Sequence, residues 1–88
     1  MRIQILGAGC SKCSKAAQVM KETAVGLGLV EGKDFELEKV TDIREIMKFR
    51  VMLTPGIVIN GKVIATGMVP SVAEAQRFIA NASTEEAK

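Results

Sequence analysis

The first third of the chain changes from a hydrophobic period of two to a period of three to four. Apolar and polar residues alternate over 2–6, which predicts a short strand ending at Gly7. From Cys10 onward the apolar period is that of a helix of about four turns, which Gly26 and Gly28 end in the manner of C-caps. The apolar face of this predicted helix consists of Cys13, Ala16, Ala17, Met20, Ala24 and Leu27.

The middle of the chain predicts a second strand and a short helix. Residues 35–40 alternate again and end at Val40. More than a dozen residues that include a helix separate the two strands, so we expect a right-handed crossover and parallel pairing. Asp42 and Glu45 have the spacing of a capping box, which predicts a helix start. The apolar positions of that helix are Ile43, Ile46 and Met47.

The last third predicts a hairpin followed by a helix. Two β-prone runs, 56–59 and 62–66, flank Asn60-Gly61, which is a strong signal for a two-residue hairpin turn. Ser71 and Glu74 form a second capping-box pattern at the start of a final helix. We expect Val72, Ala75, Phe78 and Ile79 to face inward from this helix.

These elements define the fold class as α/β, in the order βαβαββα. We expect one mixed four-stranded sheet with helices on both faces. The chain of 88 residues has the length of one domain. Because the apolar period is lost from Asn81 onward, we place the domain at residues 1–82 and expect a frayed tail at residues 83–88.

Composition excludes several classes of function. Twelve Lys and Arg against ten Asp and Glu leave a net charge of +2, which gives no electrostatic reason to expect nucleic acid or a membrane as partner. The chain has no His, Trp or Tyr, which excludes His-based acid–base catalysis and an aromatic platform for bases. No apolar run is long enough for a secretory signal or a membrane span, so we expect a cytoplasmic protein.

Two cysteines carry the candidate chemistry. Cys10-Ser11-Lys12-Cys13 lies where the first strand meets the first helix, so the unpaired N–H groups of the helix start should lower the pKa of Cys10 below its free value of about 8.5. Lys12 adds positive charge nearby. Cys13 lies on the apolar face of the helix and should be more buried. We therefore expect Cys10 to attack a disulfide and Cys13 to resolve the mixed disulfide.

Three segments resemble the thioredoxin/glutaredoxin superfamily, and most closely its small thioredoxin-like members, the redox-active disulfide proteins of archaea and bacteria. They are Cys10-Ser11-Lys12-Cys13 after the first strand, Thr54-Pro55 before the third, and Ile59-Asn60-Gly61-Lys62 at the hairpin. The resemblance implies a thioredoxin-like fold and a thiol–disulfide oxidoreductase. Its redox group would be the Cys10–Cys13 disulfide itself, with no other cofactor.

The resemblance also implies a substrate groove. In the family the proline peptide is cis and faces the cysteine pair, so Pro55 would shape the groove and the backbone of Thr54 would pair with an extended segment of a disulfide-containing protein substrate. Gly67 falls where the last strand of the family ends near the active site, and would admit a substrate backbone. The chain departs from the family at Gln4, where thioredoxins have a buried acid.

The reductant is inferred from a second departure. Glutaredoxins that use glutathione carry a Gly-Gly and acidic pair after the fourth strand, whereas this chain reads Gly67-Met68-Val69-Pro70. A flavoprotein thioredoxin-type reductase is therefore the expected electron donor.

An alternative reading is a soft-metal module. A Cys-x-x-Cys loop at a helix start also holds Cu(I) in small metal chaperones. A closed zinc site needs four ligands, which two cysteines could supply only as a dimer. The predicted βαβαββα order differs from the βαββαβ order of the copper chaperones, which favours the oxidoreductase.

Overall fold

The structure, a computed structural model, describes residues 1–7 and 11–86. Its elements are β1 (Arg2–Leu6), α1 (Ser11–Gly26), β2 (Glu36–Val40), α2 (Ile43–Lys48), β3 (Gly56–Ile59), β4 (Lys62–Thr66) and α3 (Val72–Glu86). The predicted order βαβαββα is confirmed.

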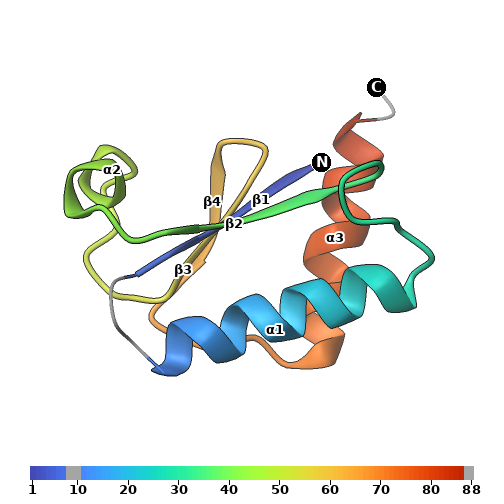
Figure 1. The fold of residues 1–88 in the computed structure, drawn as a ribbon, viewed down its shortest axis with the longest axis horizontal. Coiled ribbons are helices and arrows are strands. Elements are labelled where there is room, and N and C mark those ends of the chain that lie inside the picture. The colour runs from blue at the N-terminus through green and yellow to red at the C-terminus, as the bar shows by residue number, and fades with distance from the viewer. Residues whose placement is uncertain (8–10, 87–88) are drawn as a thin grey trace.

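The four strands form one mixed sheet in the order β2-β1-β3-β4. β1 pairs in parallel with β2 and antiparallel with β3, and β3 pairs antiparallel with β4. The register sets Ile5 on β1 opposite Lys39 on β2 and Ile57 on β3. Figure 1 shows α1 and α3 side by side, with α2 standing apart near the opposite end of the sheet. The predicted mixed sheet and parallel crossover are both confirmed.

Two hydrophobic clusters lie on the two faces of the sheet. The larger cluster joins Ile3 and Ile5 of β1 to α1 and α3, and the smaller joins Leu6, Val40 and Val58 to α2. Alternation along β1 therefore sends odd positions toward α1 and even positions toward α2. This arrangement confirms that helices cover both faces.

The predicted apolar face of α1 is buried except at its end. Cys13, Ala16, Ala17, Met20 and Ala24 are all buried. Leu27 was expected on this face, but it is 47% exposed because α1 ends at Gly26 and the chain turns away through Gly28 at a φ of 87°. The periodicity thus predicts the helix well but extends its buried face one turn too far.

α2 is shorter and less buried than its pattern suggests. Asp42 caps it by accepting a hydrogen bond from the backbone N–H of Arg44. Ile46 is buried, whereas Ile43 and Met47 are 65% and 68% exposed. A helix of six residues can turn only a narrow stripe toward the sheet, so two of its three apolar positions remain outside.

The capping box of α3 forms in full. The Ser71 hydroxyl accepts from the Glu74 backbone N–H at 3.2 Å, and the Glu74 carboxylate accepts from the Ser71 backbone N–H at 3.1 Å. Ala75 and Ile79 are buried and Phe78 is half-buried, as expected, but Val72 is 58% exposed.

α3 continues further than the sequence indicates. It runs to Glu86, although a frayed tail was expected at residues 83–88. Buried Ala82 extends the packed face of the helix, and the Thr84 hydroxyl donates to the Ala80 carbonyl. The domain boundary at residue 82 itself stays a prediction.

Candidate active site

The end of β1 lies against the first turn of α1. Gly7, the residue after β1, is buried, and its backbone N–H donates to the Val40 carbonyl at 2.9 Å. A Cβ atom at Gly7 would overlap the Sγ of Cys13 and would lie 3.5 Å from the Cβ of Thr54. The missing side chain of Gly7 thus makes room for the Cys13 sulfur.

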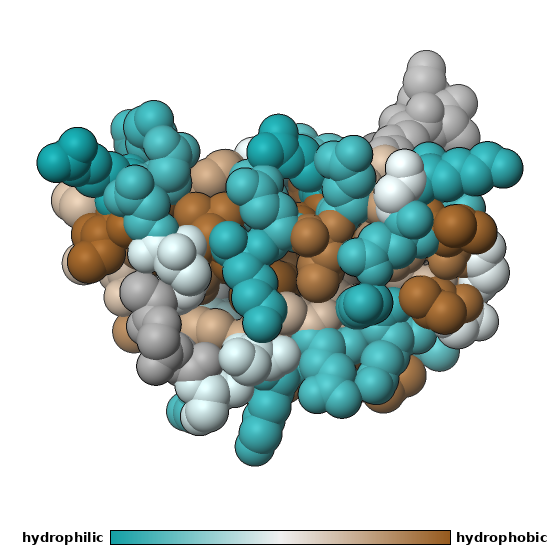
Figure 2. All heavy atoms as spheres, in the orientation of Figure 1, coloured by the Kyte–Doolittle hydropathy of each residue, from teal (hydrophilic) through white to brown (hydrophobic). Residues whose placement is uncertain are grey.

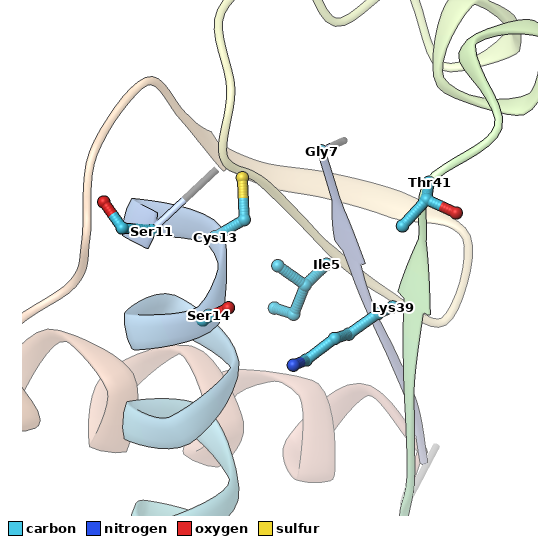
Figure 3. A pocket seen from close by; sticks show the side chains of 7 residues that line it. All are labelled: Ile5, Gly7, Ser11, Cys13, Ser14, Lys39 and Thr41. Atoms are coloured by element: carbon cyan, nitrogen blue, oxygen red, sulfur yellow. The ribbon is translucent and has the colours of Figure 1, made fainter. Parts of the chain in front are cut away.

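Cys13 is 6% exposed and belongs to the larger hydrophobic cluster. Its sulfur points toward the end of β1 at Gly7 (Figure 3). The expectation that Cys13 is buried on the apolar face of the helix is therefore confirmed. A buried thiol remains protonated more readily than an exposed one, because burial penalises the thiolate.

A cavity of about 290 Å³ opens beside Cys13. β1 contributes Ile5 and the following Gly7, and the first turn of α1 contributes Ser11, Cys13 and Ser14. Lys39 of β2 and Thr41 beyond it close the other side. Figure 3 shows the Lys39 side chain reaching across the sheet toward α1. The cavity thus places a buried thiol, three hydroxyl groups and one ammonium around a common space.

Gln4 does not lie beneath Cys13. It shares its sheet face with Leu6, which packs toward α2, and with Glu38 on the neighbouring strand, whose pKa is lowered mainly by Arg2 and to a smaller extent by the Gln4 amide. Ile5 takes the place on β1 that faces Cys13. Gln4 therefore faces away from Cys13, because a strand alternates between the two faces of its sheet.

The segment before β3 lies next to this site. The Thr54–Pro55 peptide bond is cis, Pro55 is buried, and Thr54 is exposed. The Gly67 backbone N–H donates to the Pro55 carbonyl at 2.9 Å, and a Cβ atom at Gly67 would lie 3.1 Å from the Cβ of Leu53. Pro55 and Gly67 are thus hydrogen-bonded neighbours, and Thr54 lies close to Gly7, where an added side chain would meet both Thr54 and Cys13.

The remaining predicted residues are only partly placed. Cys10, the expected nucleophile, lies outside the described residues. Ser11, which follows it, begins α1, and Lys12 is exposed on the first turn of the helix. The structure therefore contains both the strand predicted before Cys10, which is β1, and the helix predicted after it, which is α1.

Within residues 1–7 and 11–86, no cluster of three or more Cys, Asp, Glu or His side chains could hold a metal ion. In the same residues, no helix has both the length and the apolar character needed to span a bilayer.

Sequence reasoning missed Lys39 and the role of Gly7 in this site. Lys39 looks like one more dispersed surface charge when basic residues are counted. The alternation of β2 contains the missing signal, because Lys39 shares its parity with Phe35 and Leu37, which face the α1 side. Gly7 is visible in sequence only as the end of a strand.

A buried cysteine at a helix start, a cis-proline segment beside it and a mixed α/β sheet define a class of small redox-type domains. Comparison with known proteins agrees with this class. Residues 1–80 match the family model of the thioredoxin domain. The chain is 38% identical over 72 residues to a thioredoxin of Methanocaldococcus jannaschii, covering 82% of this chain and 78% of the relative.

A thioredoxin of Methanothermobacter thermautotrophicus is 29% identical over 79 residues, covering 90% of this chain and 97% of that protein. The chain belongs to the thioredoxin domain family. Its relatives support a thioredoxin-like disulfide oxidoreductase function.

Proposed function

We propose that the protein reduces disulfides in other proteins through the pair Cys10 and Cys13. The observation that carries the proposal is the buried Cys13 at the start of α1, set against Gly7 and beside Thr54. In the sequence, Cys10 precedes Cys13 by three residues, at the N-terminal side of the helix. The chain thus has the two sulfurs that a dithiol reductant requires.

The reaction would use the two cysteines in sequence. The Cys10 thiolate attacks one sulfur of the substrate disulfide, and the other substrate sulfur leaves as a thiolate that takes up a proton. Cys13 then loses its proton and attacks Cys10, which releases the second substrate thiol and leaves a Cys10–Cys13 disulfide. The positive end of α1 favours the thiolate of Cys10, and Lys12 adds to this effect.

Thr54, Pro55 and Gly67 would bind the substrate backbone. Their proximity to Cys13 supports a role in substrate binding, as does the exposure of Thr54. The residues just before them are apolar and unusually exposed, with Met52 92% and Leu53 66% accessible. Exposed apolar side chains beside a reactive centre favour a protein partner over a small polar substrate.

We propose further that a flavoprotein thioredoxin-type reductase restores the dithiol and that the protein works in the cytoplasm. The family supports a reductase as electron donor in general terms. No cofactor beyond the cysteine pair enters the proposed cycle.

Trapping with single-cysteine variants tests the proposal. The Cys13→Ser variant should accumulate a mixed disulfide between Cys10 and a protein substrate, because nothing resolves it. The Cys10→Ser variant should accumulate almost none, since Cys13 is buried. Denaturing gels without reductant measure the trapped complex. Equal trapping by both variants would contradict the assigned roles.

The reduction potential and the metal content separate the oxidoreductase from a soft-metal module. We expect a two-electron couple between about −180 and −300 mV, which is the range of thiol–disulfide oxidoreductases. The protein purified under reducing conditions should hold no stoichiometric copper or zinc. Bound metal together with slow disulfide exchange would overturn the proposal in favour of the metal-binding alternative.

A further inference from the structure

Arg50 has a backbone conformation that residues with a side chain rarely adopt. It follows α2 and its C-cap Phe49, and its φ of 57° lies in the left-handed region. Its N–H donates to the Met47 carbonyl at 2.9 Å, a bond typical of the residue just after a helix C-cap. Glycine is the usual residue there, because a Cβ atom crowds the following carbonyl oxygen. The chain therefore has an arginine where the fold alone favours glycine.

The other left-handed positions of the described chain carry residues that suit them. Four are glycines, namely Gly28, Gly32, Gly61 and Gly67. Asn60, in the hairpin turn, is of the residue type that tolerates this conformation next best. Within residues 1–7 and 11–86, Arg50 is thus the exception. Strained backbone at such a residue is typical of binding and catalytic sites.

The Arg50 side chain borders an apolar cavity, which we call the α2 pocket. Its lining residues are Met47 of α2, Arg50, Val51 and Met52, and its volume is about 270 Å³. Val51 is buried, whereas Met47 and Met52 are 68% and 92% exposed, so the pocket has a buried floor and an accessible rim. This volume is below the roughly 300–1,000 Å³ of sites for drug-sized molecules and suits a single apolar side chain of a partner.

The guanidinium of Arg50 can bind a carboxylate at the edge of this pocket. Lys48 pairs with Glu45 at 3.0 Å, and the Asp42 carboxylate accepts from the backbone N–H of Arg44. Both nearby carboxylates of the chain are therefore engaged within α2. Among the residues that the structure describes, none forms an ion pair with Arg50. The charge of the pocket is thus complementary to an acidic partner.

The α2 pocket lies beside the proposed substrate groove. Met52 is two residues before Thr54, so at most about 7 Å of chain separates them. Thr54 in turn lies close to Gly7, where an added side chain would meet Cys13. Figure 1 shows β1 ending on the side of the molecule where α2 lies. A substrate that bonds to the backbone of Thr54 would therefore reach the pocket with the second or third residue from its cysteine.

We propose that the α2 pocket selects protein disulfides whose reactive cysteine lies two residues from an apolar side chain and three from a carboxylate. The apolar side chain fills the pocket between Met47 and Met52, and the carboxylate pairs with the guanidinium of Arg50. This inference rests on the proposed function, since it names the substrates of that reaction. Arg50 is a specificity residue and takes no part in the exchange of sulfur bonds.

Synthetic peptides test the proposal. The first has the sequence Glu-Leu-Gly-Cys-Gly-Leu-Glu, which is the same in both chain directions, and its cysteine bears the coloured thiol of Ellman's reagent as a mixed disulfide. Attack by Cys10 on the peptide sulfur breaks this bond, and the coloured thiolate leaves with the electron pair. Cys13 then releases the peptide thiol and leaves the Cys10–Cys13 disulfide. A second peptide has Gln in place of Glu, and a third has Ser in place of Leu.

The Glu and Gln peptides measure the role of Arg50. The unmodified protein should have a kcat/KM about two- to fivefold higher for the Glu peptide, the range of an exposed ion pair. Salt at about 1 M should reduce this preference, because it screens exposed charges. Arg50→Gln should lose the preference, and Arg50→Lys should retain it.

Arg77→Gln is the matched control. It removes the same group from an exposed position of α3, a helix that packs on the opposite face of the sheet from α2. This variant should keep the preference for the Glu peptide. No preference in the unmodified protein, a preference that persists in Arg50→Gln, or an equal loss in Arg77→Gln would each overturn the proposal.

The Leu and Ser peptides measure the apolar part of the pocket. The unmodified protein should react with the Leu peptide with a kcat/KM about fivefold higher, from partial burial of the leucine. Met47→Ser should reduce this preference, because it removes one of the two methionines at the rim. Val25→Ser removes an apolar side chain that is 53% exposed near the other end of α1 and should leave the preference unchanged. An equal reduction in both variants, or none in Met47→Ser, would contradict the pocket.

A stability measurement separates binding from a structural role of Arg50. Arg50→Gly should raise the melting temperature by about 4–8 °C, because glycine adopts this φ without strain. The same variant should lose the preference for the Glu peptide. A melting temperature that does not rise would assign Arg50 to the fold instead and would overturn the proposal.

Failure of the proposed function would be seen separately. If the unmodified protein released no coloured thiol from any of the peptides, attack by Cys10 would be refuted. The pocket is then tested in a variant with both Cys10→Ser and Cys13→Ser, using peptides that have Ser in place of Cys. The NMR signal of the Arg50 Nε–H should shift with the Glu peptide and much less with the Gln peptide. Equal shifts would overturn the role of Arg50.

Discussion

At the scale of single residues, the site depends on one close approach. Gly7 and Cys13 come from different elements, yet any side chain on Gly7 would occupy the space of the Cys13 sulfur. The end of β1 can therefore lie directly against the first turn of α1. This contact fixes the depth at which the Cys13 sulfur is buried, and burial raises the cost of ionising a thiol.

Replacement of Gly7 by Ala should destabilise the protein by about 1–3 kcal/mol, because overpacking a filled interior forces side chains and backbone to move. Urea unfolding measures the difference. Gly26→Ala is a matched control in α1, where an added Cβ meets no atom within 4 Å. That variant should change the stability by no more than about 0.5 kcal/mol, because Gly26 is the last residue of α1 and its added Cβ meets no neighbour. Equal stability of Gly7→Ala and the unmodified protein would contradict the close approach.

Sequence alone identifies the residues of this site that belong to motifs, and it misses those that the fold brings in. Cys13 and Thr54-Pro55 stand out because their chemistry is rare and their order is informative. Lys39 and Ile5 reach the cavity only through strand alternation and the register of β1 with β2. A register is a pairing between distant segments, so a local pattern cannot supply it.

At the scale of elements, local sequence patterns predict a helix and its buried face well where the helix begins with a full capping box and buries a wide face. α3 begins at a capping box whose two hydrogen bonds both form. α2 begins at an equally clear cap, but with six residues it buries only Ile46. The apolar residues of a short helix are thus poor evidence of its buried face, since packing with the sheet decides which of them turn inward.

Removal of the α3 cap should weaken the domain, because α3 packs against α1 and so supports the helix that carries Cys13. Ser71→Ala should cost about 1 kcal/mol, the usual loss for a serine N-cap. Ser83→Ala is the control within the same helix, at an exposed position. It should be neutral or slightly stabilising. Thermal unfolding compares the two variants, and similar values for both would argue against the cap.

The pairing of β1 with β2 predicts a small acid dependence of stability. The hydrogen bond from Arg2 at 2.8 Å, followed by the charge of Arg2, lowers the pKa of Glu38 below its ordinary value of 4.5. A lowered folded-state pKa stabilises the fold above 4.5, and this contribution is lost as the pH falls through the lowered value. The effect is modest because both side chains are exposed.

Arg2→Met should raise the pKa of Glu38 toward 4.5 and flatten the dependence of unfolding on pH below that value. An NMR titration of the Glu38 carboxyl carbon measures the shift. Lys48→Met removes a cation that pairs with Glu45 instead, and should leave Glu38 unchanged. A shift of Glu38 in the Lys48 variant, or none in the Arg2 variant, would show that the Arg2 pairing is not the cause.

At the scale of the whole molecule, most apolar side chains lie in two interior clusters, while several others are exposed, some of them around α2 and the segment that follows it. The clusters cover both faces of the sheet and account for most of the predicted core. Figure 2 shows hydrophobic atoms at the surface near the end of the molecule where α2 lies, among hydrophilic neighbours. Ile43 and Met47 of α2 are exposed, and Met52 follows the helix closely. These neighbouring exposed apolar side chains are candidates for contact with a protein partner.

The last prediction concerns Met52, which is 92% exposed and two residues before Thr54. Because its side chain contributes little to the core, Met52→Ser should change the free energy of unfolding by no more than about 0.5 kcal/mol. If protein substrates cover this surface, the same variant loses about 1 kcal/mol of apolar contact with them. The KM for a protein disulfide should then rise about fivefold.

Two comparisons make this prediction specific. The reaction of Met52→Ser with Ellman's reagent should stay unchanged, because that small disulfide needs no extended surface. Val25→Ser removes an apolar side chain that is 53% exposed near the C-terminal end of α1, far along the helix from Cys13. Its KM for the protein disulfide should match that of the unmodified protein. A KM that rises equally in both variants would mean that general surface hydrophobicity, rather than the segment before Thr54, governs substrate binding.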